Sequence, residues 1–325
     1  MRFVPSYKLN ILSEENYAES MHNISKQLEE VRISGKFKSF DGVNLHYEYF
    51  LAENSKGNLV IVHGLSEFTL KFYELIYYSL NLGFNVFIYD QRCHGLSDRL
   101  TPHRDLLHVR KFKDYVKDLS SFIDKIVLPA ENKPIYLFAH SMGGGVAALY
   151  LAQQDKNSVE KAVLSAPMFE PIVENVSFNM ARFSVNIGKI IFGTKNKFFN
   201  SKEFNPEVTF KNIKGLSKAR FEYNINLRRE NENYQTTPMS FGWVSGSLNI
   251  SKKILSKKVT EKIKTPILII SANYDEMVNN KPQKEFYNKC KTCSFKNIEN
   301  ATHAILASDN DILSRVLDET FNFFS

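Results

Sequence analysis

The stretch Pro134-Ile-Tyr-Leu-Phe-Ala-His-Ser141-Met-Gly-Gly144 predicts a buried strand, a sharp turn at the serine and the start of a helix. Such a strand, turn and helix form a nucleophile elbow, which holds the serine in a strained backbone conformation. Small residues are required two positions before and two positions after the serine, and Ala139 and Gly143 occupy them. Ala139 stands where glycine is usual, but it has no side chain beyond Cβ. An ordinary turn before a helix is the alternative, and the apolar strand and glycine-rich helix around Ser141 favour the elbow.

A serine hydroxyl is a weak nucleophile at neutral pH, so the elbow predicts a histidine base and an orienting carboxylate, in the chain order serine, acid, histidine. His303 is the only histidine that follows Ser141, and Asp155 and Asp275 are the only aspartates between them. Asp275 follows an apolar run typical of a buried parallel strand, whose carboxyl end is where such sheets collect their sites. Asp155 lies in a polar stretch where a solvated carboxylate is expected. We therefore predict a triad of Ser141, Asp275 and His303, with Glu276 as an alternative acid.

Two backbone amides are expected to stabilise the oxyanion that forms when the serine attacks a carbonyl carbon. The amide of Met142 is the first, because the start of a helix favours negative charge. The amide of Leu65 is the second, because it follows the apolar run 58–63, and Gly64 lets the backbone turn towards the serine. Removing one such donor typically costs about 3 kcal/mol of transition-state stabilisation. His63 is interpreted as structural, with its ring packed beneath this loop.

Apolar runs alternate with helical patterns along most of the chain, which is typical of an α/β fold with a mostly parallel central sheet flanked by helices. Helices are expected over residues 14–31 and 112–126, and the Asp41-Gly42 pair predicts the turn of a hairpin. Strands are expected near residues 58–63, 84–90, 134–139, 161–166, 266–272 and 293–298.

The alternation stops between Ala166 and Lys258, which predicts that a cap of residues 166–258 is inserted into a core of residues 1–165 and 259–325. We call residues 166–258 the cap segment. It contains 15 Lys and Arg against seven Glu and no Asp, so it accounts for the whole excess of the formal net charge of +7. It is also rich in phenylalanine. Basic and aromatic side chains together suit a surface that meets anionic lipid headgroups and admits acyl chains.

A solvated, lysine-rich face over an ordinary aromatic core is an equally plain explanation of the same composition. Binding of nucleic acid is not expected, because no recognition motif accompanies the basic charge. The membrane hypothesis and the solvated-face hypothesis differ in one respect. Only the membrane hypothesis requires that the basic residues face a lipid surface.

Length and composition agree with one α/β core and one insertion, since 325 residues with 43% hydrophobic content can bury a large core. No run approaches the ~18 apolar residues that span a bilayer, and the first residues lack a signal-peptide pattern, so we expect a cytoplasmic protein, with any membrane contact peripheral and at the inner face. Three cysteines are too few for a disulfide framework, which fits a reducing compartment. The isolated pair Cys290-Lys-Thr-Cys293 lacks the further ligands of a zinc site. No metal or organic cofactor is expected.

Five motifs look like those of monoacylglycerol lipases and bacterial lysophospholipases, which are members of the α/β-hydrolase superfamily. The motifs are His63-Gly-Leu-Ser-Glu67, Asp90-Gln-Arg-Cys-His-Gly-Leu-Ser97, His140-Ser-Met-Gly-Gly144, Asp275-Glu-Met-Val278 and His303-Ala-Ile-Leu306. The less universal segment Pro238-Met-Ser-Phe-Gly-Trp243 resembles the inner-membrane type of bacterial lysophospholipase. The match runs through nearly the whole chain. It implies an α/β-hydrolase fold with an inserted, mainly helical cap.

Three positions depart from the family pattern. Cys93 stands where glycine is usual, Phe68 where histidine is usual in the animal lipases, and Ala304 where glutamate commonly follows the base. None of them removes a predicted catalytic group, so they bear on substrate choice rather than on catalysis. Asp90 and Arg92 are interpreted as structural residues that fix the loop after their strand.

The expected activity is hydrolysis of the carboxylic ester of a single-chain lipid by a serine esterase. Lysophospholipid is the first choice of substrate, because of the basic cap segment and the longer resemblance, and monoacylglycerol is the second. Acyl transfer to a second lipid is an alternative, since the acceptor depends on water access under the cap. A lipid-binding protein with an inactive triad is the non-enzymatic alternative, and the complete triad argues against it. The expected partners are a single-chain lipid and, through the cap segment, an anionic membrane.

Overall fold

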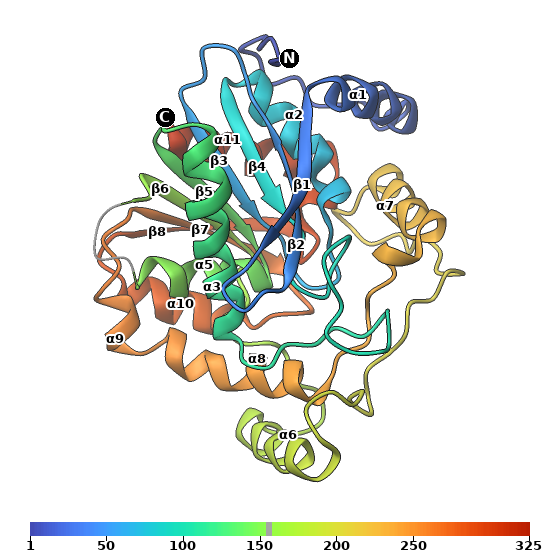
Figure 1. Cartoon of the computed structure of the whole chain (residues 1–325), viewed down its shortest axis with the longest axis vertical. Coiled ribbons are helices and arrows are strands. Elements are labelled where there is room, and N and C mark those ends of the chain that lie inside the picture. Colours follow the sequence, from blue (N-terminus) through green and yellow to red (C-terminus); the bar gives the residue numbers. More distant parts are fainter. Residues whose placement is uncertain (154–157) are drawn as a thin grey trace.

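The computed structural model describes residues 1–153 and 158–325, and at its centre lies an eight-stranded sheet with helices on both faces (Figure 1). The strands lie in the order β1-β2-β4-β3-β5-β6-β7-β8. Both neighbours of β2 run antiparallel to it, and the remaining pairs are parallel. The strands are β1 Arg32–Lys38, β2 Asn44–Phe50, β3 Gly57–Val62, β4 Phe84–Tyr89, β5 Ile135–His140, β6 Lys161–Ser165, β7 Ile267–Tyr274 and β8 Cys293–Thr302. This sheet confirms the predicted fold class.

The apolar runs predicted as strands form β3 to β8. Every residue of β3 and β4 is buried, because helices cover both faces of this part of the sheet. β8 continues beyond the expected Ile298 to Thr302, so that it ends immediately before His303. The Asp41-Gly42 turn joins β1 and β2 as predicted, and Gly42 has a φ of 86°, which favours glycine.

Two layers of helices pack on the sheet, each with its own apolar cluster. One face is covered by α1 (Tyr17–Val31), α2 (Tyr73–Asn81) and α11 (Asn310–Phe324), with the 3-10 turns η1 (Thr69–Phe72) and η4 (Ile305–Ala307) leading into the last two. The other face is covered by α3 (Lys113–Phe122), α5 (Met142–Leu151) and α10 (Asn280–Lys289). The helix predicted over residues 112–126 appears as α3, continued by the π-helical turn η2 (Ile123–Val127) and the short α4 (Leu128–Ala130).

The chain between β6 and β7 contains the helices of the cap segment. They are α6 (Phe178–Phe192), α7 (Lys218–Glu230), the 3-10 turn η3 (Glu232–Tyr234) and α8 (Phe241–Ile254), and the short α9 (Lys257–Thr260) crosses the predicted boundary at residue 258. α8 packs on the core, because its Trp243, Ile250 and Ile254 belong to the same apolar cluster as α3 and α5. α6 lies outside α8, at the edge of the molecule (Figure 1). The division of the chain into a core and a cap at residue 258 stays a prediction.

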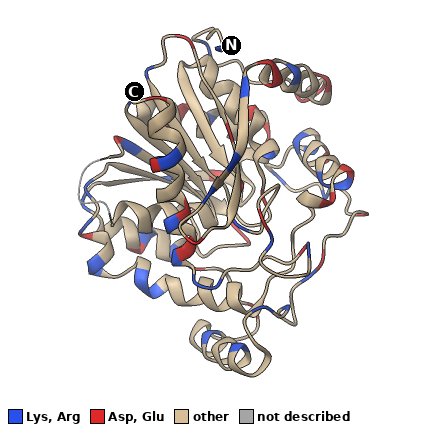
Figure 2. Cartoon of the chain, in the orientation of Figure 1, with Lys and Arg blue, Asp and Glu red and all other residues tan. Residues whose placement is uncertain are grey.

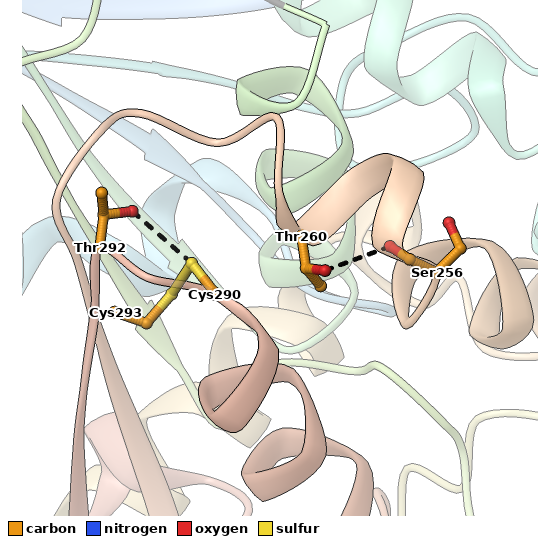
Figure 3. Close-up of a disulfide and its surroundings, with 5 residues drawn as sticks. All are labelled: Ser256, Thr260, Cys290, Thr292 and Cys293. Carbon is orange, nitrogen blue, oxygen red and sulfur yellow. Dashed lines mark hydrogen bonds between the residues drawn. A yellow bond between two sulfur atoms is a disulfide. The ribbon is translucent and has the colours of Figure 1, made fainter.

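Cys290 and Cys293 form a disulfide between the end of α10 and the start of β8 (Figure 3). The two cysteines are only three positions apart, so the bond restricts the unfolded chain much less than a long-range disulfide would. The pairing gives no support to the reducing compartment that the cysteine count suggested, and a cytoplasmic location stays a prediction. Within the described residues, no helix has both the length and the apolar character needed to cross a bilayer.

Candidate active site

Ser141 lies at the turn between β5 and α5, with a φ of 52° and a ψ of −119°. A non-glycine residue at positive φ is strained, and such strain is typical of functional sites. Gly143 is required by close packing, because a Cβ atom there would overlap the carbonyl oxygen of Val62 on β3. Ala139 is fully buried at the end of β5. The strand, strained turn and helix thus have the geometry expected of an elbow, and the role of Ser141 as nucleophile stays a prediction.

The structure brings Ser141, His303 and Asp275 together at the carboxyl ends of the parallel strands β5, β8 and β7. The Oγ atom of Ser141 lies 2.8 Å from Nε2 of His303, and Nδ1 of His303 lies 2.8 Å from Oδ2 of Asp275. Because a carboxylate can only accept, Nδ1 carries the proton of the neutral ring, and Nε2 is left to accept the serine hydroxyl. The three side chains therefore form a chain of two hydrogen bonds, which is the arrangement that a nucleophile, a base and an orienting acid require, and their roles stay a prediction.

Asp275 is held by the backbone as well as by the histidine. Its Oδ1 atom accepts hydrogen bonds from the amides of Met277 (2.9 Å) and Val278 (2.8 Å), and the carboxylate is fully buried. Glu276, the alternative acid, is exposed, and no hydrogen bond or ion pair within the described part of the chain involves its carboxylate. Asp155, the other aspartate between the serine and the histidine, lies outside the described residues. The geometry thus favours Asp275.

The two amides expected to face the oxyanion lie next to Ser141. Met142 is the first residue of α5 and is fully buried. Leu65 follows Gly64, and a Cβ atom on Gly64 would lie only 2.9 Å from Cβ of Ser141, so this loop passes directly against the serine. Among the hydrogen bonds of residues 1–153 and 158–325, none is donated by either amide. Both are free to bind a developing oxyanion, and that role stays a prediction.

An ion pair beside the serine was missed in the sequence analysis. Glu67 accepts a hydrogen bond from the amide of Gly64 (2.5 Å), and its other oxygen pairs with Nζ of Lys71 (2.5 Å). Burial raises the pKa of Glu67, but the charge of Lys71 and these hydrogen bonds outweigh it and hold the pKa at about 2. The ionised carboxylate therefore fixes the turn that places Leu65. Glu67 and Lys71 are four residues apart, a spacing that favours an ion pair on a helical turn. This spacing, next to the His63-Gly64 motif, could have predicted the pair from the sequence.

His63 is structural, as predicted. Its ring is fully buried, with Nδ1 2.8 Å from the carbonyl oxygen of Gly64, and Nε2 accepts a hydrogen bond from the amide of Gln91 (2.9 Å). Burial lowers the pKa of this histidine, so the ring stays neutral. The neutral ring joins the loop after β3 to the loop after β4, and His303 remains the candidate base.

Asp90 and Arg92 fix the loop after β4, as predicted. Oδ1 of Asp90 accepts hydrogen bonds from the amide (2.8 Å) and the hydroxyl (2.9 Å) of Thr69. Nε of Arg92 lies 2.6 Å from the buried carboxylate of Asp118. Cys93, which follows Arg92, has a φ of 64°, which explains why glycine is usual at this position.

His140 lies beside the base, and its ring centre is 5.2 Å from that of His303. Its Nδ1 atom lies 3.2 Å from the carbonyl oxygen of Ser165. Burial lowers the pKa of His140 to about 4, although the nearby carboxylate of Glu67 opposes this shift. The ring is therefore neutral at pH 7, and it adds no positive charge that would oppose protonation of His303.

We expect the free energy of unfolding to fall as the pH drops from about 6.5 towards 4. Burial lowers the pKa of both His140 and His108 from 6.5 to about 4, so the folded state binds fewer protons than the unfolded state in this window. The contribution of these two histidines to the free energy of unfolding is fully present above pH 6.5. Each histidine should account for a loss of about 2 kcal/mol between pH 7.5 and 5.0. Urea unfolding at both pH values measures the loss. In His108→Gln the loss of unfolding free energy between these pH values should be smaller by about 2 kcal/mol, the part due to His108. An undiminished loss would contradict the assignment.

The cap segment contacts the loop beside the serine through an aromatic stack. The ring centres of Phe68 and Tyr234 are 4.2 Å apart, and the rings are inclined by only 10°. The phenylalanine that replaces the usual histidine therefore offers an apolar face to η3. Arg99 also donates a hydrogen bond to the carbonyl oxygen of Asn233 (2.9 Å). The stack ties the cap segment to the loop that carries Leu65, and the hydrogen bond of Arg99 ties it to the loop after β4.

Candidate metal ligands do not cluster within residues 1–153 and 158–325, where no group of three or more His, Cys, Asp or Glu side chains is arranged to hold an ion. Near the serine, the ring nitrogens of His63 and His303 have the protein partners described above. The expectation that no cofactor takes part stays a prediction.

Comparisons with known proteins extend over most of the chain. The family model described as "Serine aminopeptidase, S33" matches residues 53–311. The "Probable lysophospholipase L2" of Haemophilus influenzae is 28% identical over 290 residues, which cover 87% of this chain and 89% of that protein. Lysophospholipase L2 of Escherichia coli strain K12 is 27% identical over 303 residues, which cover 90% of this chain and 88% of that protein.

Solved structures share the fold at lower identity. A soluble variant of monoglyceride lipase from Saccharomyces cerevisiae has a TM-score of 0.70 at 18% identity, covering 89% of this chain and 93% of that one. A thermostable carboxyl esterase from Bacillus coagulans has a TM-score of 0.71 at 17% identity, covering 90% and 98%. The α/β-hydrolase fold and the family resemblance expected from the motifs are therefore confirmed. Because the family model spans most of its sequence, this chain belongs to the S33 serine aminopeptidase family of α/β hydrolases.

Proposed function

We propose that this protein is a serine esterase that hydrolyses the carboxylic ester of single-chain lipids, with lysophospholipid as its first substrate. The observation that carries the proposal is the pair of 2.8 Å hydrogen bonds from Ser141 through His303 to Asp275. The lysophospholipase L2 relatives support the substrate class, because they match over nearly the full length of both chains.

In the proposed reaction, Oγ of Ser141 attacks the ester carbonyl carbon while Nε2 of His303 takes the hydroxyl proton. The oxyanion accepts hydrogen bonds from the amides of Leu65 and Met142, and Asp275 stabilises the imidazolium. Collapse of the tetrahedral intermediate breaks the bond to the alcohol, which leaves with the proton from His303. Water then attacks the acyl-enzyme with the same histidine as base, and the fatty acid is released.

Three other activities use the same first step. Monoacylglycerol is the second substrate candidate, and the shared fold of the yeast monoglyceride lipase is compatible with it. Acyl transfer would replace water by a second lipid. The family description also names an aminopeptidase, in which the acyl-enzyme would form from an amide. A protein with an inactive triad would bind lipid without any of these steps.

A substrate panel tests the proposal. The purified protein is given lysophosphatidylcholine, lysophosphatidylethanolamine, monoolein and an aminoacyl p-nitroanilide, and released fatty acid or nitroaniline is measured. Faster release from a lysophospholipid than from monoolein supports the first choice, and the reverse order supports the second. Cleavage of the anilide alone would reject the esterase. An acyl-transferred lipid in place of fatty acid would identify a transferase, and failure of a fluorophosphonate to label the protein would identify an inactive triad.

We further propose that the cap segment makes peripheral contact with an anionic membrane surface. Its exposed basic residues include Lys252 and Lys253 on α8. Arg228 is different, because it donates hydrogen bonds within the cap segment, including one to Oγ1 of Thr237 (2.6 Å), and lies over the ring of Phe204 at 4.2 Å. Burial lowers the pKa of Arg228 to about 10. Arg228 therefore supports the cap segment, and the exposed lysines are the charges to test.

Binding to vesicles that contain anionic lipid is expected to weaken as salt rises, because exposed charges are screened over ~8 Å at physiological ionic strength. The double reversal Lys252→Glu/Lys253→Glu should weaken binding about tenfold or more, since each basic residue near such a surface contributes about 1 kcal/mol. Co-sedimentation at several salt concentrations measures this. Hydrolysis of a short soluble ester is the control and should change less than about twofold. Equal binding to neutral and anionic vesicles at every salt concentration would favour a solvated face instead.

A further inference from the structure

α6 has two apolar faces rather than one. Its small residues Ala181, Val185 and Gly188 lie against α8, where they pack with Phe241 and Leu248. The fit is close, because a Cβ atom on Gly188 would lie 2.6 Å from the ring of Phe241. This first face is therefore fully used in holding α6 to the rest of the protein.

The second face is exposed. Its residues recur every three or four positions and so form one stripe along the helix. We call this set the α6 stripe: Met180, Phe183, Ile187, Ile190 and Ile191, which are 54%, 66%, 41%, 81% and 67% exposed. Exposed stripes of large apolar side chains are rare on monomeric proteins, and they mark interaction surfaces.

Basic residues accompany the α6 stripe. The chain holds no acidic residue from Asn175 to Lys202, although Arg182, Lys189, Lys195 and Lys197 lie within this range. Arg182 and Lys189 are seven residues apart, which places them on one side of α6, between its two apolar faces. Figure 2 shows Lys and Arg on α6 and no Asp or Glu. Lys197 is paired with Glu203 (2.6 Å), so Arg182, Lys189 and Lys195 are the positive charges that accompany the α6 stripe.

An anionic bilayer fits both the α6 stripe and its charges. Its acyl chains can receive the apolar side chains, and its headgroups can neutralise the basic ones. A second copy of this chain fits less well, because a two-fold interface would bring each α6 against the other and place basic residues beside basic residues. The position of α6 at the edge of the molecule, outside α8, leaves room for an extended surface to approach (Figure 1).

We propose that the α6 stripe inserts into the interfacial region of an anionic phospholipid bilayer and is the part of the protein that enters the membrane. The helix would lie parallel to the surface, with α8 behind it and Arg182 at the level of the headgroups, while Nζ of Lys189 donates a hydrogen bond to Oγ of Ser245 on α8 (3.1 Å). This inference rests on the proposed lipid esterase for its purpose, because docking brings the cap segment to the surface where the substrate is found.

Tryptophan fluorescence can test insertion directly. Trp243 is the only tryptophan of the chain, and it is buried, so an added tryptophan reports its own surroundings. We expect Phe183→Trp to be quenched strongly by vesicles of phosphatidylcholine and phosphatidylglycerol whose acyl chains carry bromine. Tyr7→Trp is the matched control, since Tyr7 is 60% exposed near the N-terminus, far from α6 in Figure 1. Equal quenching of the two variants, or of neither, would overturn the proposal.

Vesicle binding gives a second test. The triple variant Phe183→Ser/Ile190→Ser/Ile191→Ser should lose about 100-fold or more in binding, because tenfold is 1.4 kcal/mol and three large apolar side chains no longer enter the bilayer. Val4→Ser/Tyr7→Ser, which also changes exposed apolar residues, should bind as the unaltered protein does. Unchanged binding of the triple variant would overturn the proposal. A dimer that becomes a monomer in this variant, measured by light scattering, would assign the α6 stripe to a second copy instead.

Hydrolysis of a short soluble ester separates the two proposals. A protein that is quenched through Phe183→Trp but cleaves no ester would refute the proposed function and support docking. A protein that cleaves lipid esters without quenching at this position would refute docking and leave the esterase standing.

Discussion

Ser141→Ala is expected to lower ester hydrolysis by about a millionfold and to abolish labelling by a fluorophosphonate, while the protein stays folded. The lost hydroxyl is the attacking group of the proposed reaction, and it makes the 2.8 Å hydrogen bond to His303. The substitution keeps the Cβ atom that lies against Gly64, so little packing is lost. The rate with a short p-nitrophenyl ester, the extent of labelling and the urea midpoint measure the three expectations.

Ser165→Ala provides a matched control for this substitution. Ser165 is a buried serine at the end of the neighbouring strand β6, and among the described residues its hydroxyl has no hydrogen-bond partner. The control variant should keep its activity within about threefold, because it removes a hydroxyl of the same size that takes no part in the proposed chemistry. Substantial turnover by folded Ser141→Ala protein would reject Ser141 as the nucleophile.

The base and the acid should show losses nearly as large. His303→Ala is expected to be almost as inactive as Ser141→Ala, because the hydroxyl then has no acceptor for its proton. Asp275→Asn should lower kcat by about 10⁴, since an amide at this place favours the wrong tautomer of the histidine. A double variant of Ser141→Ala with Asp275→Asn should be hardly worse than the first alone, because the three residues act as a unit. Steady-state kinetics with the soluble ester measure each loss.

Glu276→Gln is the control for the acid. Its carboxylate is exposed and has no partner within the described residues, so kcat should change less than about threefold. If Asp275→Asn keeps its activity and Glu276→Gln loses it, Glu276 is the acid and Asp275 has only a structural role.

The sequence by itself determined the elbow, the fold class and the candidate triad. Each rests on information that is local or ordered along the chain. The apolar runs before Ser141 and Asp275 specify buried strands, the small residues around Ser141 specify the tight turn, and His303 is the only histidine in the required order. In a mostly parallel sheet, the ends of such strands lie at one edge, so strand ends that are distant in sequence become neighbours in space.

The tertiary structure alone decided how the other charged and apolar residues are used. Composition counted Arg228 among the free basic charges of the cap segment, but packing on Phe204 leaves it only partly exposed. Periodicity cannot tell that Glu67 faces Lys71 and the Gly64 amide, nor that α6 buries one apolar face and exposes the other. Burial and pairing depend on which elements meet after folding, and a single sequence records the pattern of each element but not its neighbour.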